Sequence, residues 1–189
     1  MSGNEKFIWP ELSSIHTVIF DFDGVFTNNK VYLDQNGVES VRCDRADGLG
    51  LDMLRCVINR MRLNLDMFIL SKEPNPVVLK RAAKLKLDCH HGISNKYDYL
   101  KTYFREKKPD NKKPFNGLIY LGNDLNDYQV MKNSAIAVAP LDADVRILEI
   151  SSIVMERKGG DGFVRCFIEL FITKNFNNEV VNECLYSKG

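Results

Sequence analysis

The sequence Thr-Val-Ile-Phe-Asp-Phe-Asp-Gly-Val-Phe-Thr, at positions 17–27, joins an apolar run to two closely spaced carboxylates. Its first four residues are all β-branched or aromatic, which predicts a short strand buried on both faces, as in a parallel sheet. The strand delivers Asp21 and Asp23 into a turn at Gly24. Two carboxylates placed together in this way indicate a nucleophile and an acid/base that share a metal, and such an arrangement suits phosphate chemistry.

Strand-like and helix-like patterns alternate along the chain. Apolar runs predict strands at 15–20, 67–70, 118–121, 136–138 and 153–155, and apolar residues at helical spacing predict helices around 47–61, 78–85, 97–104 and 128–131 and a final helix at about 162–172. Strands separated by helices imply crossover connections, so we expect a doubly wound α/β fold with a Rossmann-like parallel sheet. Asn36 and Gly37, between two alternating arms, predict a β-hairpin inserted after the first strand.

Composition limits the classes of protein and partner. With 189 residues, 44% of them apolar, we expect one domain over 1–189 with its core at about 15–172. The chain has 26 basic and 25 acidic residues, so it lacks the basic excess of a nucleic-acid binder. No apolar stretch is long enough for a membrane span, and five cysteines without a CxxC pair indicate neither zinc nor a disulfide framework. We therefore expect a cytoplasmic protein with no nucleic acid or membrane as partner.

Polar residues follow the predicted strands, at the sheet edge where ligands bind in such folds. Ser71 follows the strand at 67–70, Lys96 lies near a helix start, and an acidic loop at 122–127 follows the strand at 118–121. We interpret Asp21 as a nucleophile that forms an acyl phosphate and Asp23 as the group that protonates the leaving alcohol. Ser71 as a hydroxyl donor and Lys96 as a point charge would hold phosphate oxygens.

A divalent cation completes this interpretation. A negatively charged phosphoryl group approaching a carboxylate needs a hard cation with oxygen ligands. Mg²⁺ would be bound by Asp21, the main-chain carbonyl of Asp23 and the loop at 122–127. An EF-hand starting at Asp21 is excluded, because Phe26 and Tyr32 stand where its glycine and glutamate belong. A plain turn at Asp21–Gly24 is the remaining alternative, but four polar groups at successive strand ends favour a site.

These residues together resemble a known superfamily. The set Asp21-x-Asp23-Gly24-Val25-x-Thr27, Ser71, Lys96 and Gly122-x-x-x-x-Asp127 resembles the haloacid dehalogenase superfamily of aspartate-nucleophile phosphatases. From about 15 to 172 the chain is similar to the capless group that contains 3-deoxy-manno-octulosonate 8-phosphate and acylneuraminate 9-phosphate phosphatases. It is also similar to the C-terminal domain of some acylneuraminate cytidylyltransferases.

The resemblance implies further features. The stretch Arg45-Ala46-Asp47-Gly48-Leu49-Gly50 looks like the group's substrate loop, so Gly24, Arg45, Asp47, Gly48 and Glu73 are candidate substrate-binding residues. The resemblance also implies that no cap domain is present, that the hairpin builds a homotetramer, and that a neighbouring subunit closes the pocket. The glycine-rich stretch at 159–162 matches a segment of the group that approaches an active site.

Two positions depart from the octulosonate branch. Glu73 stands where that branch usually has Arg; an acidic group repels a sugar-acid carboxylate but accepts hydrogen bonds from hydroxyl or acylamino groups. We therefore favour a nine-carbon acylneuraminate 9-phosphate as substrate over the eight-carbon 8-phosphate, unless Glu73 is only a solvated residue at a helix start. Asn123 stands where an Mg²⁺-binding Asp is more usual, so either Asn123 or Asp124 is the expected ligand, with Asp127 as an outer-shell partner.

Three functions fit the sequence. A Mg²⁺-dependent phosphatase for a small sugar-acid phosphate is favoured, because the nucleophile, the acid/base, Ser71 and Lys96 are all present. The alternative is a non-catalytic or weakly active oligomerisation module, like the domain attached to the cytidylyltransferases; loss of Asp21 or Lys96 would have indicated it. A third class is another phosphotransfer enzyme of the same fold, but the resemblance implies a cap for the mutases, and no segment between Thr27 and Gly48 is long enough for one.

Overall fold

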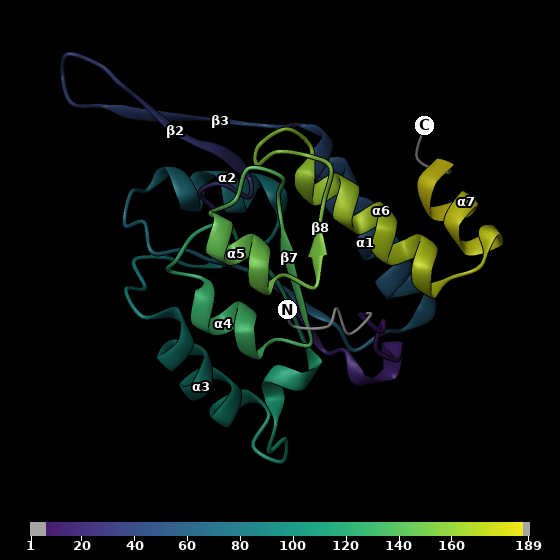
Figure 1. Cartoon of the computed structure of the whole chain (residues 1–189). Helices are drawn as coiled ribbons and strands as arrows, with labels where there is room; N and C mark the ends of the chain where they lie inside the picture. Colours follow the sequence, from purple (N-terminus) through teal and green to yellow (C-terminus); the bar gives the residue numbers. More distant parts are fainter. Residues whose placement is uncertain (1–6, 187–189) are drawn as a thin grey trace.

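The computed structural model describes residues 7–186, and its centre is a six-stranded parallel sheet (Figure 1). The strands are β1 (Thr17–Phe20), β4 (Asp66–Leu70), β5 (Asp88–His90), β6 (Leu118–Leu121), β7 (Ile136–Ala139) and β8 (Ile153–Val154), in the order β5-β4-β1-β6-β7-β8. Each neighbouring pair is parallel. The predicted doubly wound α/β fold is confirmed.

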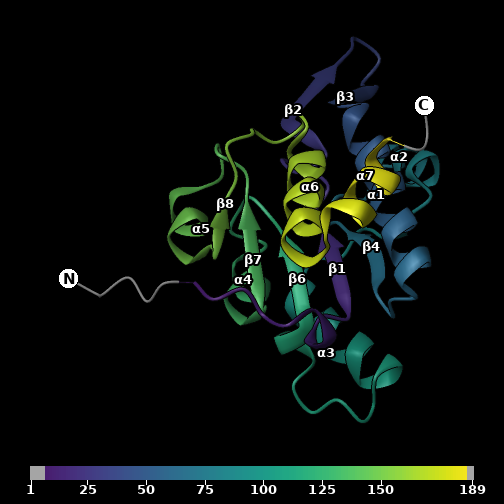
Figure 2. The ribbon, with the colours of Figure 1, turned by 90° about the vertical axis from the view of Figure 1, so that its right-hand side faces the viewer.

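Helices cover both faces of the sheet (Figures 1 and 2). One layer holds α1 (Ala46–Met61), α2 (Val77–Leu85), α6 (Phe163–Asn175) and α7 (Asn178–Tyr186), and the other holds α3 (Lys96–Lys107), α4 (Tyr128–Asn133) and α5 (Val145–Ile150). Short 3-10 turns lie at Leu12–Ser14 and Pro114–Gly117. Val18 and Phe20 pack into the first layer and Ile19 into the second, because successive side chains of a strand point to opposite faces.

The contact between α1 and α6 is close because of a glycine. A Cβ atom at Gly50 would lie 3.0 Å from the Cα of Arg165 in α6, so the two helices approach only because Gly50 has no side chain. The buried face of α6 carries Phe163, Phe167 and Phe171, each with no exposed surface. Full burial of such a side chain stabilises the fold by roughly 1.5–3 kcal/mol. Within residues 7–186, no helix has the length and hydropathy required to cross a bilayer.

The order of the strands places a crevice beside β1. The chain leaves β1 through the hairpin and α1 to reach β4, on one side of β1. It returns from β5 through α3, on the opposite face of the sheet, to β6 on the other side of β1. The connections therefore diverge on either side of β1, and in open α/β sheets ligands bind beyond the carboxyl ends of the strands at such a point.

The hairpin after the first strand is also confirmed. It consists of β2 (Thr27–Leu33) and β3 (Glu39–Cys43), which pair antiparallel and extend beyond the helical layers (Figure 1). The Asp34 Oδ1 atom accepts hydrogen bonds from the main-chain N–H groups of Asn36 (2.8 Å) and Val38 (2.9 Å), and Gly37 has a φ of +77°. The Asn36–Gly37 signal therefore marks a turn closed by the aspartate before it.

Three elements lie outside the predicted pattern, and each lacks a strong local signal. Strand β5 has only three residues at the edge of the sheet, and none of them is fully buried. Helix α5 has six residues with one buried apolar side chain, Ile147. Asp144 caps its N-terminus, where the side chain accepts from the N–H of Arg146. The helix predicted at about 162–172 is α6, but the prediction that it is the last helix was wrong, because α7 follows it.

The glycine-rich loop before α6 packs directly on the turn after β1. The N–H of Gly160 donates to the carbonyl of Val25 (3.1 Å), and a Cβ atom at Gly159 would lie 2.0 Å from the carbonyl oxygen of Gly24. Both partners in this contact are backbone, so neither can move aside without shifting the turn. The loop therefore fixes the conformation of the residues around Gly24.

We predict that Gly159→Ala destabilises the protein, because the added methyl group overlaps the backbone at Gly24. The expected loss is about 2 kcal/mol of unfolding free energy, typical of overpacking, measured by urea denaturation. Gly48→Ala is the matched control: its Cβ would lie 3.4 Å from Leu85, an ordinary contact, and alanine favours a helix. Equal midpoints for Gly159→Ala and the wild type would contradict the proposed contact.

Candidate active site

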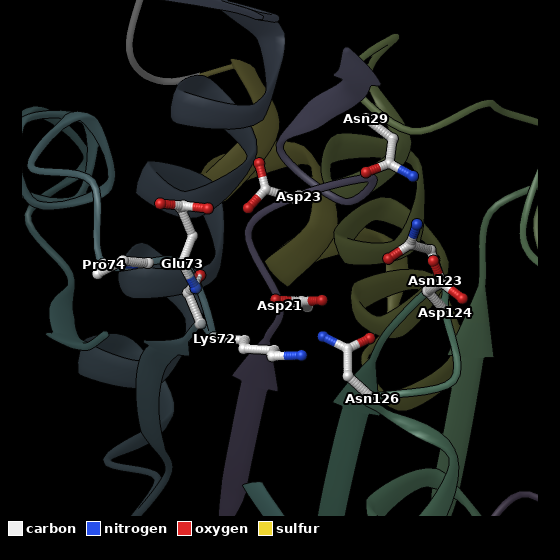
Figure 3. Close-up of a pocket in the computed structure, with 10 residues that line it drawn as sticks. Asp21, Asp23, Asn29, Lys72, Glu73, Pro74, Asn123, Asp124 and Asn126 are labelled. Carbon is white, nitrogen blue, oxygen red and sulfur yellow. Dashed lines mark hydrogen bonds between the residues drawn. The ribbon is translucent and has the colours of Figure 1, made fainter. Parts of the chain in front are cut away.

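A pocket of about 340 Å³ lies beyond the carboxyl ends of β1, β4 and β6 (Figure 3). Its lining is predominantly polar and consists of Asp21, Asp23, Asn29, Ser71, Lys72, Glu73, Pro74, Asn123, Asp124 and Asn126. This is the crevice that the strand order predicts. The structure thus brings together residues from three strand ends that are up to about a hundred positions apart in sequence.

Asp21 stands at the centre of the pocket (Figure 3) and is 3% exposed. Its N–H extends the pairing with β6 by donating to the carbonyl of Leu121 (2.9 Å), so its position is fixed by the sheet. Its Oδ1 accepts from the N–H of Phe22 (2.6 Å) and lies 2.7 Å from Lys96 Nζ. Among the described residues no hydrogen bond reaches Oδ2, so this oxygen is available to a ligand.

Lys96 is the first residue of α3 and is buried between two carboxylates. Asn95 caps the helix by accepting from the N–H of Asp98, which directs Lys96 inward. The Lys96 ammonium lies 2.7 Å from Asp21 Oδ1 and 2.7 Å from Asp127 Oδ1. Burial alone lowers the pKa of Lys96, but the attraction of Asp127 and Asp21 is stronger and raises it. Lys96 therefore stays protonated.

Asp127 connects Lys96 to the loop after β6. Its Oδ1 accepts from the hydroxyl of Tyr120 (2.8 Å) as well as from Lys96, and its Oδ2 accepts from the N–H of Asn123 (3.0 Å). Asp127 has no exposed surface. Asp127 therefore lies behind the pocket wall and contacts groups of the site, and its outer-shell role stays a prediction.

Asp23 and Ser71 line the same pocket as Asp21. Burial, followed by repulsion from Glu73, raises the pKa of Asp23, and a carboxyl group that holds its proton more readily is suited to act as an acid. Ser71 is 1% exposed and its Oγ accepts from the N–H of Glu73 (3.0 Å). Ser71 therefore shapes the turn, and its hydroxyl hydrogen remains available to a ligand in the pocket.

The pocket offers oxygen atoms suited to a hard cation. Asp21, Asp23 and Asn123 all line it, and Asn123 fits against Gly24, whose φ of +78° and missing side chain leave the space that the amide fills. Asp21 and Asp127 are both buried and share the single ammonium of Lys96, so burial, followed by repulsion from Asp127, raises the pKa of Asp21 well above its usual range, and a cation beside Asp21 would offset that repulsion. The donor set and the charge therefore fit Mg²⁺.

Of the two expected metal ligands in the loop, Asn123 is better placed. Asn123 is 7% exposed and faces Asp21 across the pocket (Figure 3). Asp124 is exposed at the rim, and its Oδ1 accepts from the N–H of Leu125 (2.7 Å). No cluster of three or more His, Cys, Asp or Glu side chains suited to a metal occurs in residues 7–186.

Glu73 lies on the side of the pocket opposite Asn123 (Figure 3). Its Oε1 accepts from the N–H of Asn75 (2.8 Å), and Asn75 Nδ2 donates to Glu39 Oε2 (3.0 Å) on the hairpin. A second hollow of about 240 Å³ continues from here between the hairpin and α2, lined in part by Glu39 and Val31. Glu73 thus combines a pocket position with the turn-forming role of a residue before a helix.

Arg45, Asp47 and Gly48 are not brought into the pocket. Arg45 is exposed, and Gly48 packs near Leu85 in α2. Asp47 has no exposed surface, and its Oδ1 accepts from the N–H of Arg165 (3.0 Å) in the first turn of α6. In this chain the stretch expected to be a substrate loop forms the start of α1 and contacts α6, so Asp47 does not line the pocket.

Five residues at the site were missed by the sequence interpretation. Asn29, Lys72, Pro74 and Asn126 line the pocket, and Tyr120 contacts Asp127 behind it. Asn29, with a φ of +58°, and Asn126 resemble ordinary loop residues, so nothing in the sequence singles them out. Tyr120 carried a usable signal, since a buried phenol in an apolar strand needs a hydrogen-bond partner.

The fold and the site define a class of doubly wound α/β proteins with a buried aspartate–lysine pair at the switch point of the sheet, and comparison with known proteins identifies the family. No family model matches the chain. A solved structure described as a HAD family hydrolase from Streptomyces avermitilis is 33% identical, with a TM-score of 0.74, over 87% of this chain and 95% of that one. The chain belongs to the haloacid dehalogenase family of hydrolases.

More distant relatives have named activities. The 3-deoxy-D-manno-octulosonate 8-phosphate phosphatase of Salmonella typhi is 27% identical over 168 residues, which cover 87% of this chain and 83% of that protein. The structure of the corresponding Moraxella catarrhalis phosphatase, in complex with magnesium, phosphate and the sugar acid, is 21% identical. It covers 90% of this chain and 94% of that one, with a TM-score of 0.76. The relatives with named activities are thus phosphatases.

The burial of Asp47 has a consequence for stability. Burial raises the pKa of Asp47 to about 7, against the hydrogen bond from Arg165 and with added repulsion from Asp44. No hydrogen bond reaches its Oδ2 among the described residues. In the unfolded chain the pKa of an aspartate is about 3.9, so between about pH 4 and pH 7 the folded state binds more protons than the unfolded state. The contribution of Asp47 to the unfolding free energy therefore falls as pH rises through this range.

We predict that Asp47→Asn removes this pH dependence, because asparagine keeps the acceptor for the Arg165 N–H but does not titrate. Relative to the wild type, the variant is expected to gain up to about 3 kcal/mol of unfolding free energy between pH 5 and pH 8, since about two pH units of this range lie below the pKa of folded Asp47 and each corresponds to about 1.4 kcal/mol. Urea denaturation at both pH values measures the difference. Asp88→Asn, at an exposed position, should follow the wild type. If the unfolding free energies of Asp47→Asn and the wild type change equally with pH, ionisation of Asp47 does not destabilise the folded state.

Proposed function

We propose that this protein is a Mg²⁺-dependent phosphatase that hydrolyses a sugar-acid phosphate through an aspartyl-phosphate intermediate. The observation that carries the proposal is the buried pair at the centre of the pocket: Lys96 holds Oδ1 of Asp21 at 2.7 Å and leaves Oδ2 directed to a ligand. An ion pair that only stabilised the fold would not require a polar pocket beside Asp21. The relationship to phosphatases across most of the chain supports the same activity.

The reaction follows from the positions of two carboxylates. Asp21 attacks the phosphorus atom, the bond from phosphorus to the sugar oxygen breaks, and Asp23 gives its proton to that oxygen. Asp23 then takes a proton from water, which attacks the phosphorus of the aspartyl phosphate and releases inorganic phosphate. Both carboxyl groups return to their initial states. Lys96 fixes the orientation of Asp21 and offsets negative charge on the phosphate oxygens, and the Ser71 hydroxyl donates a hydrogen bond to one of these oxygens.

Mg²⁺ would be held by Asp21, the main-chain carbonyl of Asp23 and Asn123, with Asp124 available at the rim. When bound, it supplies the positive charge that lets an anionic phosphate approach an anionic nucleophile. The Moraxella phosphatase, which has the same fold, is described with magnesium and phosphate bound. The repulsion between Asp21 and Asp127, which share one ammonium, supports a cation at this position.

The proposed substrate is an acylneuraminate or related nonulosonate 9-phosphate, in preference to 3-deoxy-manno-octulosonate 8-phosphate. Glu73, with Glu39 nearby, makes the side of the pocket opposite Asn123 acidic. Carboxylates accept hydrogen bonds from hydroxyl and acylamino groups and repel a carboxylate. The valines that line the adjoining hollow, Val31, Val41 and Val77, offer an apolar wall to an acyl group.

The alternative function as an oligomerisation module has its own supporting observation. The hairpin exposes Val31, Tyr32, Leu33 and Val38, each with more than half of its surface accessible, and exposed apolar clusters of this kind mark association surfaces. We propose a homotetramer built through this hairpin, compatible with catalysis. A single capless domain over 1–189 and a cytoplasmic location stay predictions.

The phosphatase proposal is tested by a phosphate-release screen with Mg²⁺ over sugar phosphates and keto-acid phosphates, including the eight-carbon and nine-carbon substrates. We expect the nine-carbon substrate to have the higher kcat/KM. Asp21→Asn should lower kcat by at least about 1,000-fold, because it removes the nucleophile. Asp88→Asn, the same change at an exposed position, should have no effect. A preference for the eight-carbon substrate would contradict the proposed role of Glu73 in substrate choice. Equal phosphate release by the wild type and Asp21→Asn from every substrate would contradict the proposed phosphatase activity.

The metal site is tested by adding a charge to it. We predict that Asn123→Asp tightens Mg²⁺ binding on the order of tenfold, because a carboxylate ligand adds charge at the ion. Calorimetric titration of the purified variants measures this. Asn126→Asp is the control, since it adds the same charge to the pocket lining at an exposed position. If both variants tighten binding equally, general electrostatic attraction explains the effect and Asn123 is not a ligand.

A further inference from the structure

Tyr120 is a buried polar residue that the proposed reaction does not use. It lies on β6 between Ile119 and Leu121, has no exposed surface, and faces the layer of α3 and α4. A buried phenol costs free energy unless its hydroxyl finds a partner. Its hydroxyl donates to Asp127 Oδ1 at 2.8 Å.

The partner carboxylate connects two parts of the site. Asp127 Oδ1 also accepts from Lys96 Nζ (2.7 Å), while Oδ2 accepts from the N–H groups of Asn123 (3.0 Å) and Asp124 (3.4 Å). Asp127 fits only because Gly122 lacks a side chain, since a Cβ atom there would lie 2.7 Å from the Asp127 carboxylate. A rotation of this carboxylate would therefore displace both the ammonium beside the nucleophile and the loop with the candidate metal ligand.

We propose that Tyr120 is a positioning residue, which acts through Asp127 to hold Lys96 beside Asp21 and to hold the loop at 123–124. The inference rests on the proposed phosphatase function. Lys96 is shared between Asp21 and Asp127 at equal distances. By donating to Asp127 Oδ1, Tyr120 weakens the pull of Asp127 on Lys96 and fixes the plane of its carboxylate. Without this hydroxyl, the ammonium moves toward Asp127 and Asp21 loses its orientation.

Tyr120 does not line the pocket, so its loss should leave substrate binding intact. Tyr120→Phe keeps the ring and its packing and removes one hydrogen bond to a charged group. We expect kcat to fall about tenfold with KM within about twofold, and Mg²⁺ binding to weaken a few-fold. Tyr103→Phe is the matched control: it makes the same change in the aromatic cluster of α3, away from Asp127. It should leave kcat, KM and Mg²⁺ affinity unchanged.

A double-mutant cycle separates this role from a general effect on the fold. In Asp127→Asn, the amide oxygen is required by the N–H groups of Asn123 and Asp124, so its NH2 group faces Tyr120 and cannot accept from it. Tyr120→Phe should therefore change kcat by less than about twofold in this background. Thermal midpoints of all variants show whether each is folded.

Each outcome decides between the explanations. Unchanged kcat and Mg²⁺ affinity in Tyr120→Phe, with or without a lower thermal midpoint, would overturn the inference and leave Tyr120 a structural residue. A raised KM with constant kcat, or a full effect in the Asp127→Asn background, would overturn it as well. If the wild-type protein releases phosphate from no substrate, the proposed function is wrong. The role of Tyr120 is then decided by comparing the Mg²⁺ affinities of Tyr120→Phe and Tyr103→Phe.

Discussion

The structure depends on one interaction, the burial of the Lys96 ammonium between the carboxylates of Asp21 and Asp127. Removing three charged groups from water costs several kcal/mol for each ion, and their attraction offsets this cost only when geometry and hydrogen bonding are close to ideal. The surrounding hydrogen bonds supply that geometry. Phe22 donates to Asp21, while Tyr120 and the loop after β6 donate to Asp127. Lys96 alone does not offset the burial of both carboxylates and their mutual repulsion, which raise the pKa of Asp21, and the proposed cation would bind beside that carboxylate.

The fold delivers these three groups from elements that meet at only one point. Strands β1 and β6 are neighbours, so Asp21 and the loop that ends at Asp127 start from adjacent strand ends. Helix α3 crosses the opposite face from α1 and presents Lys96 from its first turn. Glycines allow the close contacts: Gly122 admits the Asp127 carboxylate, and Gly24 admits the side chain of Asn123. The site is thus a product of the strand order together with positions where a side chain would not fit.

The sequence predicts those parts that have a local signal. The strand before Asp21, the hairpin at Asn36 and the pairing of polar residues with strand ends all depend on near neighbours in the chain. Strand β5 and helix α5 could not be predicted in this way, since few of their residues are buried and tertiary contacts hold them. Asp47 shows the limit most clearly: its motif indicates a substrate loop, whereas its carboxylate caps α6, more than a hundred residues later. No local pattern carries that information.

The two departures from the octulosonate branch have a common physical meaning. Asn123 makes the phosphate end of the pocket less negative than an aspartate would, and Glu73 makes the opposite end more negative (Figure 3). A less negative phosphate end lowers the repulsion of the phosphate, at the expense of a weaker hold on the cation. An acidic opposite end excludes a carboxylate and accepts donors. Both changes therefore favour a ligand whose phosphate lies toward Asn123 and whose part near Glu73 presents hydroxyl or amide hydrogens. The acylated sugar acid that we propose as substrate meets this requirement when its carboxylate lies away from Glu73.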